Sequence, residues 1–507
     1  MFYVSLYIEL LRSRPNLLFW VAALAQAAIW ILAPTFFYFA PPGDLAQLLA
    51  IGHEFRFDSG VGPPLAYWLA EVAFRIRGLF GVYVLAQICV VTAYWCVFTL
   101  GRAIVGPAHA VMAVLLMVGI SLLTVPSPDF GPPILAMALW ALVLSYYWQA
   151  VIQGKKQSWY VLGGAAALLL ITSEAALILL GTLATFTALD ERGRSALDTR
   201  EPWIAAVALT PFLFVHLLWL HGIESLALVL ERLRVAEAAG YNTSSWLRLL
   251  IALVLAHAGL VILVVLASGW PGAGTTPSLP LTRHTVDVFA KTFVKVLFAV
   301  PALLATIIAV VLGRSAPIGG AAPLVVLSGL AVVIAAGDSI ALYHQRVLGF
   351  AWAGLLVAPA AFIPLLILLL PWTAGIDLKV AQPANAIGRF FADSFERRTG
   401  RPLAIVTGDP RTAALVALAA PSRPSLFFDY DPGRSPWITA DDIRKKGAVV
   451  VWLAADTTPT PPPDIAAYFP DLVPEVPRTF GRPVQGRMPP LRIGWGVIRP
   501  GSVAAAH

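Results

Sequence analysis

Long uninterrupted apolar runs fill residues 17–370 and constrain the fold more than any other feature of the sequence. Runs of about 18 or more apolar residues are long enough to cross a hydrocarbon core of roughly 30 Å. In that core every backbone N–H and C=O group has to be paired within the protein, which favours helices. None of the runs alternates between apolar and polar residues as membrane β-strands do. The sequence therefore predicts a polytopic α-helical membrane protein.

The charge and cysteine content argue against an ordinary soluble protein, a nucleic-acid-binding protein and a disulfide-stabilised fold. Only 12% of the residues are charged, against about 25% in ordinary soluble proteins. The net charge of +7 comes from cations scattered through loops, which does not indicate a nucleic-acid partner. Cys89 and Cys96 lie in one apolar segment, so no disulfide framework is expected.

Eleven membrane spans are predicted from the apolar runs. The fifth and sixth are short, and a single long helix is the alternative for them. The predicted spans are 17–38, 79–100, 108–125, 131–150, 159–171, 173–189, 203–221, 246–268, 291–312, 320–337 and 348–370.

The orientation follows from the cations in the loops. With a cytoplasmic N-terminus, the inside loops carry Arg12, Arg14, Arg102, Lys155, Lys156, Arg192, Arg194 and Arg200. The outside loops carry fewer: Arg56, Arg75, Arg77, Arg232 and Arg234. This asymmetry is typical of multi-pass membrane proteins. It places the loop 39–78 and the short connection 126–130 on the outer side. Eleven spans, with the fifth and sixth counted separately, place the C-terminal segment there as well.

The first outer loop, residues 39–78, has an amphipathic pattern. Asp44, Gln47 and Glu54 fall on one side of a helix, and the opposite side carries apolar residues: Leu45, Leu48, Leu49 and Phe55. Such a helix is expected to lie in the headgroup plane with its apolar side towards the lipid. A second amphipathic helix is predicted from Pro63 to Phe74, with prolines at its start. The alternative is that both segments are only connectors.

After residue 377 the pattern changes to short β-type runs that alternate with helical segments. Strands are predicted at 403–407, 426–428, 448–453 and 491–498, and helices at 411–420 and 439–446. This alternation predicts a small α/β domain with a mostly parallel sheet. The proline-rich stretch 456–490 is expected to be an irregular loop. The chain thus divides into a membrane domain, 1–376, and a soluble α/β domain, 377–507.

Two carboxylates from distant segments are expected at the same outer membrane face. Asp44 follows the first span, and Asp129 follows the third. Acids beside a membrane are candidates for function where they face a protein cavity, and a carboxylate is able to act as a general base. We expect both side chains to line one outward-facing pocket. The alternatives are solvated loop acids or helix caps, with Asp129 capping the fourth span.

The residues around Asp44 resemble glycosyltransferase family 39 of the GT-C superfamily, which includes protein mannosyltransferases and lipid A aminoarabinose transferases. The resemblance rests on an acid, a helix that ends in a Glu, and a Pro-Pro-Leu with a following Tyr-Trp-Leu. These are found at Asp44-Leu45-Ala46-Gln47, Gly52-His53-Glu54-Phe55 and Gly62-Pro63-Pro64-Leu65-Ala66-Tyr67-Trp68-Leu69, with Asp129 as the family's second acid. The similarity covers most of residues 10–370 and is weak in the later spans.

The resemblance implies a hexosyl or pentosyl transferase that takes a sugar from a polyprenyl phosphate at the outer face of a bacterial inner membrane. The acceptor would be a lipid or glycan, such as lipopolysaccharide or another envelope glycan. Asp44 would be the catalytic carboxylate near the acceptor hydroxyl, and Asp129 would assist. A membrane transporter or a non-catalytic scaffold is the competing interpretation.

Departures from the family leave the donor phosphate without its expected cation. Val61-Gly62 stands where the lipid A enzymes carry Glu-Lys, and Leu45 replaces the second acid of an Asp-Glu pair. Arg56, Arg75 and Arg346 are the substitute candidates. Tyr343 and Arg346 resemble a donor-binding patch, yet the span count places 338–347 on the cytoplasmic side.

Further side chains are candidates for binding. Glu54 is assigned to substrate binding, and Tyr67 is able to stack on a sugar, although interfacial aromatic belts account for it equally well. A divalent cation held by Glu54 with His53 or His221 is conceivable, but two ligands are weak evidence for a metal. Glu174 stands in an apolar hairpin, where a buried acid needs a partner; the alternative is that it lies in water at the tip of the loop.

Overall fold

The computed structural model describes residues 2–57, 61–223, 243–268, 280–376 and 378–501. The chain forms two compact units. Unit 1 comprises Met1–Leu32 and Tyr83–Ala361, and unit 2 comprises Ala33–Val82 and Phe362–His507. The first outer loop thus groups with the C-terminal segment, a pairing that the sequence alone does not reveal. Arg232 and Arg234 lie outside the described residues.

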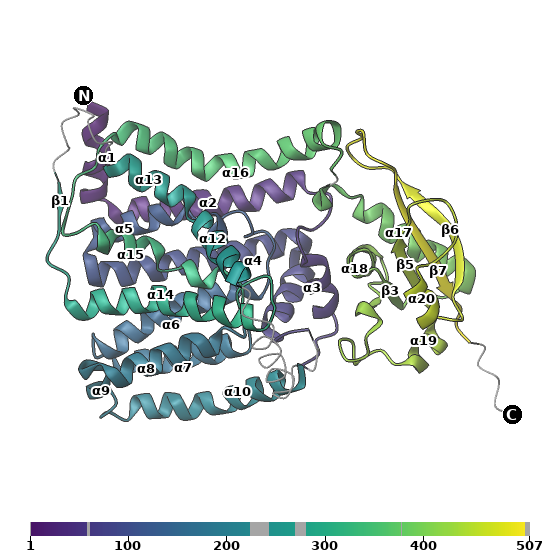
Figure 1. The fold of residues 1–507 in the computed structure, drawn as a ribbon, viewed down its shortest axis with the longest axis horizontal. Helices are drawn as coiled ribbons and strands as arrows, with labels where there is room; N and C mark the ends of the chain where they lie inside the picture. The colour runs from purple at the N-terminus through teal and green to yellow at the C-terminus, as the bar shows by residue number, and fades with distance from the viewer. Residues whose placement is uncertain (1, 58–60, 224–242, 269–279, 377, 502–507) are drawn as a thin grey trace. The chain divides into compact units, whose positions relative to one another are not determined.

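Unit 1 is built of helices that run back and forth between its two ends (Figure 1). Three of its helices continue into unit 2: α2 (Pro15–Phe37), α4 (Leu65–Val105) and α16 (Gln345–Thr373). The remaining elements are α1 (Phe2–Ser13), α5 (Pro107–Met117), η1 (Ser121–Leu123), α6 (Pro132–Val151), α7 (Lys156–Leu170), α8 (Ala176–Leu189), α9 (Glu191–Ala196), α10 (Glu201–Ile223), α12 (Thr243–Ala256), α13 (Ala258–Ser268), β1 (Leu281–Thr282), α14 (Val288–Val311), η2 (Pro323–Val325), α15 (Ser328–Ala335) and β2 (Ser339–Ile340).

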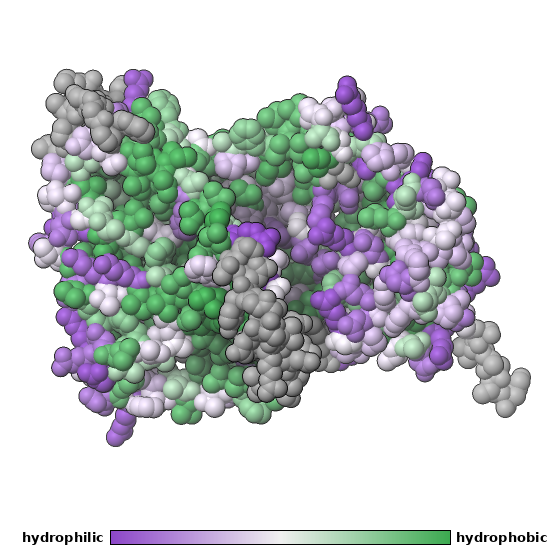
Figure 2. Space-filling model, in the orientation of Figure 1, coloured by the Kyte–Doolittle hydropathy of each residue, from purple (hydrophilic) through white to green (hydrophobic). Residues whose placement is uncertain are grey.

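Helices of unit 1 present apolar side chains on their outer surfaces. Val207 is 72% exposed, Phe214 61% and Phe350 69%, and a soluble protein rarely leaves so much contiguous apolar surface in water. Hydrophobic residues also cover most of these helices on the face drawn in Figure 2. Within the described residues, six helices are long and apolar enough to span a membrane, or seven if the bent pair α12 and α13 is one span. The chain is a multi-pass membrane protein, and the count of eleven spans stays a prediction.

Basic residues gather at one end of unit 1, here called the basic end: Arg12, Lys156, Arg192 and Arg283. Ion pairs hold its loops together, among them the pair of Arg192 with Asp287. Lys156 Nζ lies 3.3 Å from Glu201 Oε1, and Arg283 Nε lies 3.3 Å from Asp338 Oδ1. Because Asp338 directly precedes β2, this end also contains the β1–β2 pair.

The opposite end of unit 1, here called the Asp129 end, contains the loops around Asp129, Glu174 and Arg314. Helix α6 starts beside Asp129 and runs for 20 residues, about 30 Å, to the basic end. The loop after α14 closes over the start of α6, since a Cβ at Gly320 would lie 2.6 Å from the Pro133 ring. The two ends are therefore separated by roughly the thickness of a hydrocarbon core.

Unit 2 contains a five-stranded sheet with the order β4-β3-β5-β7-β6. Strand β3 pairs in parallel with β4 and β5, whereas β7 pairs antiparallel with β5 and β6. Its elements are α3 (Leu45–Gly52), η3 (Lys379–Ala381), α17 (Ala384–Thr399), β3 (Ile405–Gly408), α18 (Pro410–Ala419), β4 (Ser425–Phe427), η4 (Phe428–Tyr430), α19 (Ala440–Lys446), β5 (Ala448–Leu453), α20 (Pro463–Tyr468), β6 (Val473–Phe480) and β7 (Leu491–Ile498).

The predicted strands are all present: β5 and β7 have the predicted bounds, and β3 and β4 are shifted by one or two residues. The sheet is not mostly parallel, because two of its strand pairs are parallel and two are antiparallel. The stretch 456–490 is not wholly irregular, because it contains α20 and β6. Strand β6 carries Pro474 and Pro477, which remove two donors from a strand. The strand tolerates them because it lies at the sheet edge and its register shifts between Glu475 and Arg478.

Helix α3 packs inside unit 2 and does not lie on a lipid surface. Leu45 and Leu49 are fully buried, and α3 contacts α18. The headgroup-plane prediction for its apolar side is therefore wrong: that side is covered by the α/β layer. The break between the loop helix and the second span is confirmed, since Arg77 and Gly78 have non-helical backbone angles within α4.

A capping box starts α19 and gives a testable pH effect. The Thr439 hydroxyl donates to Asp442 Oδ2 at 2.6 Å, and this bond chiefly lowers the pKa of Asp442 to about 2. We expect Thr439→Ala to cost about 1 kcal/mol of stability, measured by thermal unfolding of the full chain.

The pH dependence has a definite sign. A lowered folded-state pKa stabilises the fold above the ordinary value of 3.8, and this contribution is lost as the pH falls towards about 2. Thr439→Ser keeps the hydroxyl and serves as the control. Equal midpoints for Thr439→Ala and wild type at pH 7 would contradict the assignment.

Candidate functional site

Asp44 is exposed at the start of a helix whose remaining residues are largely buried. It occupies the N-cap position of α3, yet its side chain accepts no capping hydrogen bond. N-cap acids ordinarily accept a bond from the second or third helical N–H. The Asp44 carboxylate therefore does not cap α3, while its backbone carbonyl accepts from the Leu48 N–H at 3.0 Å.

The anchor of α3 is a close approach to α4 within unit 2. A Cβ at Gly52 would lie 2.4 Å from the Tyr67 carbonyl oxygen, so only glycine fits there. Tyr67 is 9% exposed, and its hydroxyl packs against Gly62. The structure thus places Tyr67 inside the loop, where it shapes the segment and offers little surface for stacking on a sugar.

Glu54 and Arg56 lie beyond the other end of α3. The helix has eight residues, so its ends are about 12 Å apart, and Asp44 and Glu54 are at opposite ends. Glu54 Oε1 is buried and has no hydrogen-bond partner among the described residues. Arg56 is exposed.

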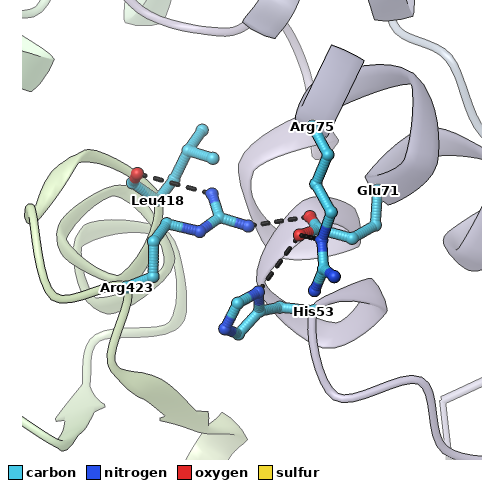
Figure 3. A network of polar contacts seen from close by, with 5 residues as sticks. All are labelled: His53, Glu71, Arg75, Leu418 and Arg423. Carbon is cyan, nitrogen blue, oxygen red and sulfur yellow. Dashed lines mark hydrogen bonds and ion pairs between the residues drawn. The ribbon is translucent and has the colours of Figure 1, made fainter.

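Glu71 is the centre of a polar network that the sequence did not single out (Figure 3). Its side chain is 2% exposed. It accepts hydrogen bonds from Arg423 at 2.7 Å, from Arg75 Nε at 2.9 Å and from His53 Nδ1 at 3.1 Å. The sequence does contain one signal of this network: Glu71 and Arg75 are four residues apart, a spacing that favours an ion pair on one helix.

Arg423 connects this network to the α/β layer of unit 2. It follows α18 with a positive φ of 48°, and its guanidinium lies 4.7 Å from the centre of the Phe74 ring. Burial lowers the pKa of Arg423, and the Glu71 carboxylate opposes that shift. The network therefore ties the segment that carries Asp44 to the loop after α18.

The residues present do not fit the conceivable divalent cation. His53 donates to Glu71 and not to Glu54, and Glu71 is already compensated by two arginines. Within the described part of the chain, no three His, Cys, Asp or Glu side chains converge. The side chain of His221 lies outside the described part.

Asp129 belongs to unit 1 and is half-buried in the loop before α6. Its N–H donates to the Pro126 carbonyl at 2.9 Å. The N-cap of α6 is Gly131, without a side-chain capping bond, so Asp129 does not cap that helix from the N-cap position. Asp44 belongs to unit 2, and the prediction that both carboxylates line one pocket stays a prediction.

Buried amides hold the Asp129 loop against α2 and α4. Gln26 donates to the Leu123 carbonyl at 3.0 Å and accepts from the Tyr94 hydroxyl at 2.9 Å. Gln87 donates to Ser127 Oγ at 3.0 Å. Polar groups in an apolar interior are costly unless paired, so these bonds fix the loop that carries Asp129.

Replacing Gln26 by leucine should destabilise unit 1. The change leaves the buried Tyr94 hydroxyl and the Leu123 carbonyl without this partner, at about 1–3 kcal/mol each. Thermal unfolding of the detergent-solubilised chain measures the effect. Gln153 is exposed, and Gln153→Leu is the control. Equal midpoints for the two variants would refute the role of Gln26.

The expectation that Glu174 needs a partner is confirmed. Arg314 NH1 lies 2.6 Å from Glu174 Oε2, and the two side chains are 35% and 23% exposed. Both lie at the Asp129 end of unit 1. Arg314 is the cation that the sequence interpretation missed, because 140 residues separate it from Glu174.

Tyr343 and Arg346 are not brought to Asp129. They follow β2 at the basic end of unit 1, and the Tyr343 N–H donates to the Ala267 carbonyl at 2.9 Å. The structure separates them from Asp129 by about the length of α6, roughly 30 Å. One substrate phosphate does not reach both places.

Comparisons with known proteins agree with this architecture. Residues 61–219 match the family described as dolichyl-phosphate-mannose-protein mannosyltransferase. The sequence matches none of the curated proteins with which it was compared.

Solved structures with a similar fold include ArnT from Cupriavidus metallidurans bound to undecaprenyl phosphate. Its TM-score is 0.56 at 12% identity, over 97% of this chain and 98% of that one. The Archaeoglobus fulgidus oligosaccharyltransferase in the apo form has a TM-score of 0.44 at 14% identity, over 87% and 70%. Residues 61–219 thus match the mannosyltransferase family, and the fold of this membrane protein is similar to that of ArnT.

Proposed function

We propose that this chain transfers a hexosyl or pentosyl group from a polyprenyl-phosphate donor to a lipid or glycan acceptor at the periplasmic face of a bacterial inner membrane. The observation that carries the proposal is an exposed carboxylate, Asp44, fixed at the start of a buried helix just before the segment that matches the mannosyltransferase family. The undecaprenyl phosphate bound to ArnT supports a polyprenyl-phosphate donor.

In this reaction the acceptor hydroxyl attacks the anomeric carbon of the sugar. A new C–O bond forms, the bond from the anomeric carbon to the phosphate oxygen breaks, and polyprenyl phosphate leaves with the electron pair. Asp44 takes the hydroxyl proton as general base. Asp129 assists by binding the acceptor or orienting the donor, and holding both substrates in place supplies rate by proximity.

The leaving phosphate requires a cation. Arg314 is the strongest candidate in unit 1 because it lies at the same end as Asp129, whereas Arg346 does not. In unit 2, Arg56 is exposed and Arg75 is occupied by Glu71. Charge-assisted hydrogen bonds from an arginine fit phosphate geometry well. Glu54 is assigned to the acceptor because its buried oxygen has no partner among the described residues.

The orientation follows from charge. The basic end of unit 1 faces the cytoplasm, since cytoplasmic loops are enriched in Lys and Arg. The Asp129 end then faces the periplasm, and the α/β layer of unit 2 is periplasmic as well.

The test uses the purified full chain in lipid vesicles with radiolabelled undecaprenyl-phosphate sugars and an envelope-lipid extract. The expected result is label in an acceptor and release of undecaprenyl phosphate in equal amounts. Label that crosses to the other leaflet without bond formation would replace the proposal with transport. Label left on the donor throughout, with every sugar tried, would leave the proposal without support and favour a scaffold.

A further inference from the structure

A large apolar cavity lies at the basic end of unit 1, far from Asp129. Its volume is about 660 Å³, within the range of roughly 300–1,000 Å³ typical of small-molecule sites. It opens between α1, α2, α5, α13, α15 and α16, and most of its wall is aliphatic or aromatic. Representative lining residues are Leu11, Val21, Met112, Leu263, Val333 and Trp352.

One buried polar atom in the wall has no hydrogen-bond partner within the described part of the chain. Gln345 is 6% exposed and lines the cavity. Its Nε2 donates to the Leu342 carbonyl at 3.3 Å, but its Oε1 has no hydrogen-bond partner among the described residues. A buried acceptor without a donor is costly, so a ligand in this cavity is expected to supply an O–H or N–H group.

The chain beside the cavity is cationic. Arg12 follows the lining residue Leu11, and Arg346 follows the lining residue Gln345. Arg12 and Arg14 are exposed, as is Arg346, and Glu9 is the nearby acid on α1. Cations beside a pocket between membrane helices on the cytoplasmic side are typical of sites for anionic lipids.

We propose that this cavity binds an anionic, hydroxyl-bearing phospholipid of the phosphatidylglycerol class, with an acyl chain in the apolar part and the headgroup at Gln345 and the arginines. The apolar wall selects a lipid tail, the arginines select a negative phosphate, and Gln345 Oε1 selects a headgroup hydroxyl. Phosphatidylcholine has the same tail but no net charge and no hydrogen-bond donor.

The test is native mass spectrometry of the delipidated full chain, titrated separately with phosphatidylglycerol, phosphatidylcholine and undecaprenyl phosphate. We expect phosphatidylglycerol to bind roughly tenfold more tightly than phosphatidylcholine. Ala336 is an exposed residue that lines the cavity, and Ala336→Trp should fill it and remove this binding. The neighbouring Ala335 is exposed and does not line it, so Ala335→Trp is the matched control.

Gln345→Leu keeps the volume of the side chain and tests the headgroup separately. It should reduce the preference for phosphatidylglycerol over phosphatidylcholine, and it remains informative if Ala336→Trp fails to fold. Equal binding of the two phospholipids to the wild type would overturn the headgroup assignment. Phosphatidylglycerol binding that Ala336→Trp leaves unchanged would overturn the proposal itself. So would undecaprenyl phosphate that binds more tightly than phosphatidylglycerol and loses its binding in Ala336→Trp.

Discussion

Asp44→Asn should abolish most sugar transfer while the protein inserts and folds normally. Asparagine has nearly the same shape, and Asp44 makes no capping bond that the change would break. It cannot accept a proton from the acceptor hydroxyl, however, and loss of a general base lowers the rate by roughly 10²–10⁴-fold. Initial rates of label transfer in vesicles measure the effect.

The control for Asp44→Asn is the same substitution at another exposed acid of unit 2. Asp393 is exposed on α17, and Asp393→Asn should transfer at the wild-type rate. Both variants should unfold at the wild-type temperature. If Asp44→Asn retains the wild-type rate, the acid is a solvated loop residue and the catalytic assignment fails.

Among the single charge removals that we consider in the described part of unit 2, Glu71→Gln should be the most destabilising. The substitution leaves Arg423, which is 18% exposed, beside a neutral amide. Removing one member of a buried ion pair costs about 3–5 kcal/mol because the other charge stays desolvated. For a unit of this size, 3 kcal/mol lowers the unfolding midpoint by roughly 6–12 °C.

The matched control for Glu71→Gln is Glu475→Gln. Glu475 pairs with Arg398 at 2.9 Å, but these side chains are 30% and 31% exposed, and such pairs contribute about 0–1 kcal/mol. Thermal unfolding of both variants in detergent makes the comparison. The double variant Glu71→Leu with Arg423→Leu should recover much of the loss, because it removes both buried charges. A Glu71→Gln midpoint no lower than that of Glu475→Gln would show that the network does not stabilise the unit.

Local patterns were enough to predict elements whose stability is local. The length of the apolar runs predicted the long helices, because a membrane-spanning helix pairs its backbone N–H and C=O groups within itself. The break at Arg77–Gly78 and strands β5 and β7 follow from short-range sequence as well. Strand β6 escaped prediction because its prolines disfavour a strand except at an edge, and edge position is a property of the whole sheet.

Asp44 and Asp129 were nominated by the sequence, since acids next to apolar spans are rare and stand out. Glu71 and Arg314 were missed for the opposite reason. Each looks like an ordinary charge in its own segment, and its meaning comes from a partner far along the chain, Arg423 or Glu174. A pattern within a short stretch of sequence does not reveal such a pair.

By itself, the sequence determined that this protein folds in a membrane and which acids beside the membrane are candidates for function. The length of apolar runs and the charge of loops are both visible in short stretches of sequence. Only the tertiary structure decided that α3 packs against α18, that Arg314 pairs with Glu174 and that Glu71 is buried among cations. Those outcomes depend on which surfaces meet. Burial and ion pairing are properties of contacts between distant segments, and they exist only once the chain has folded.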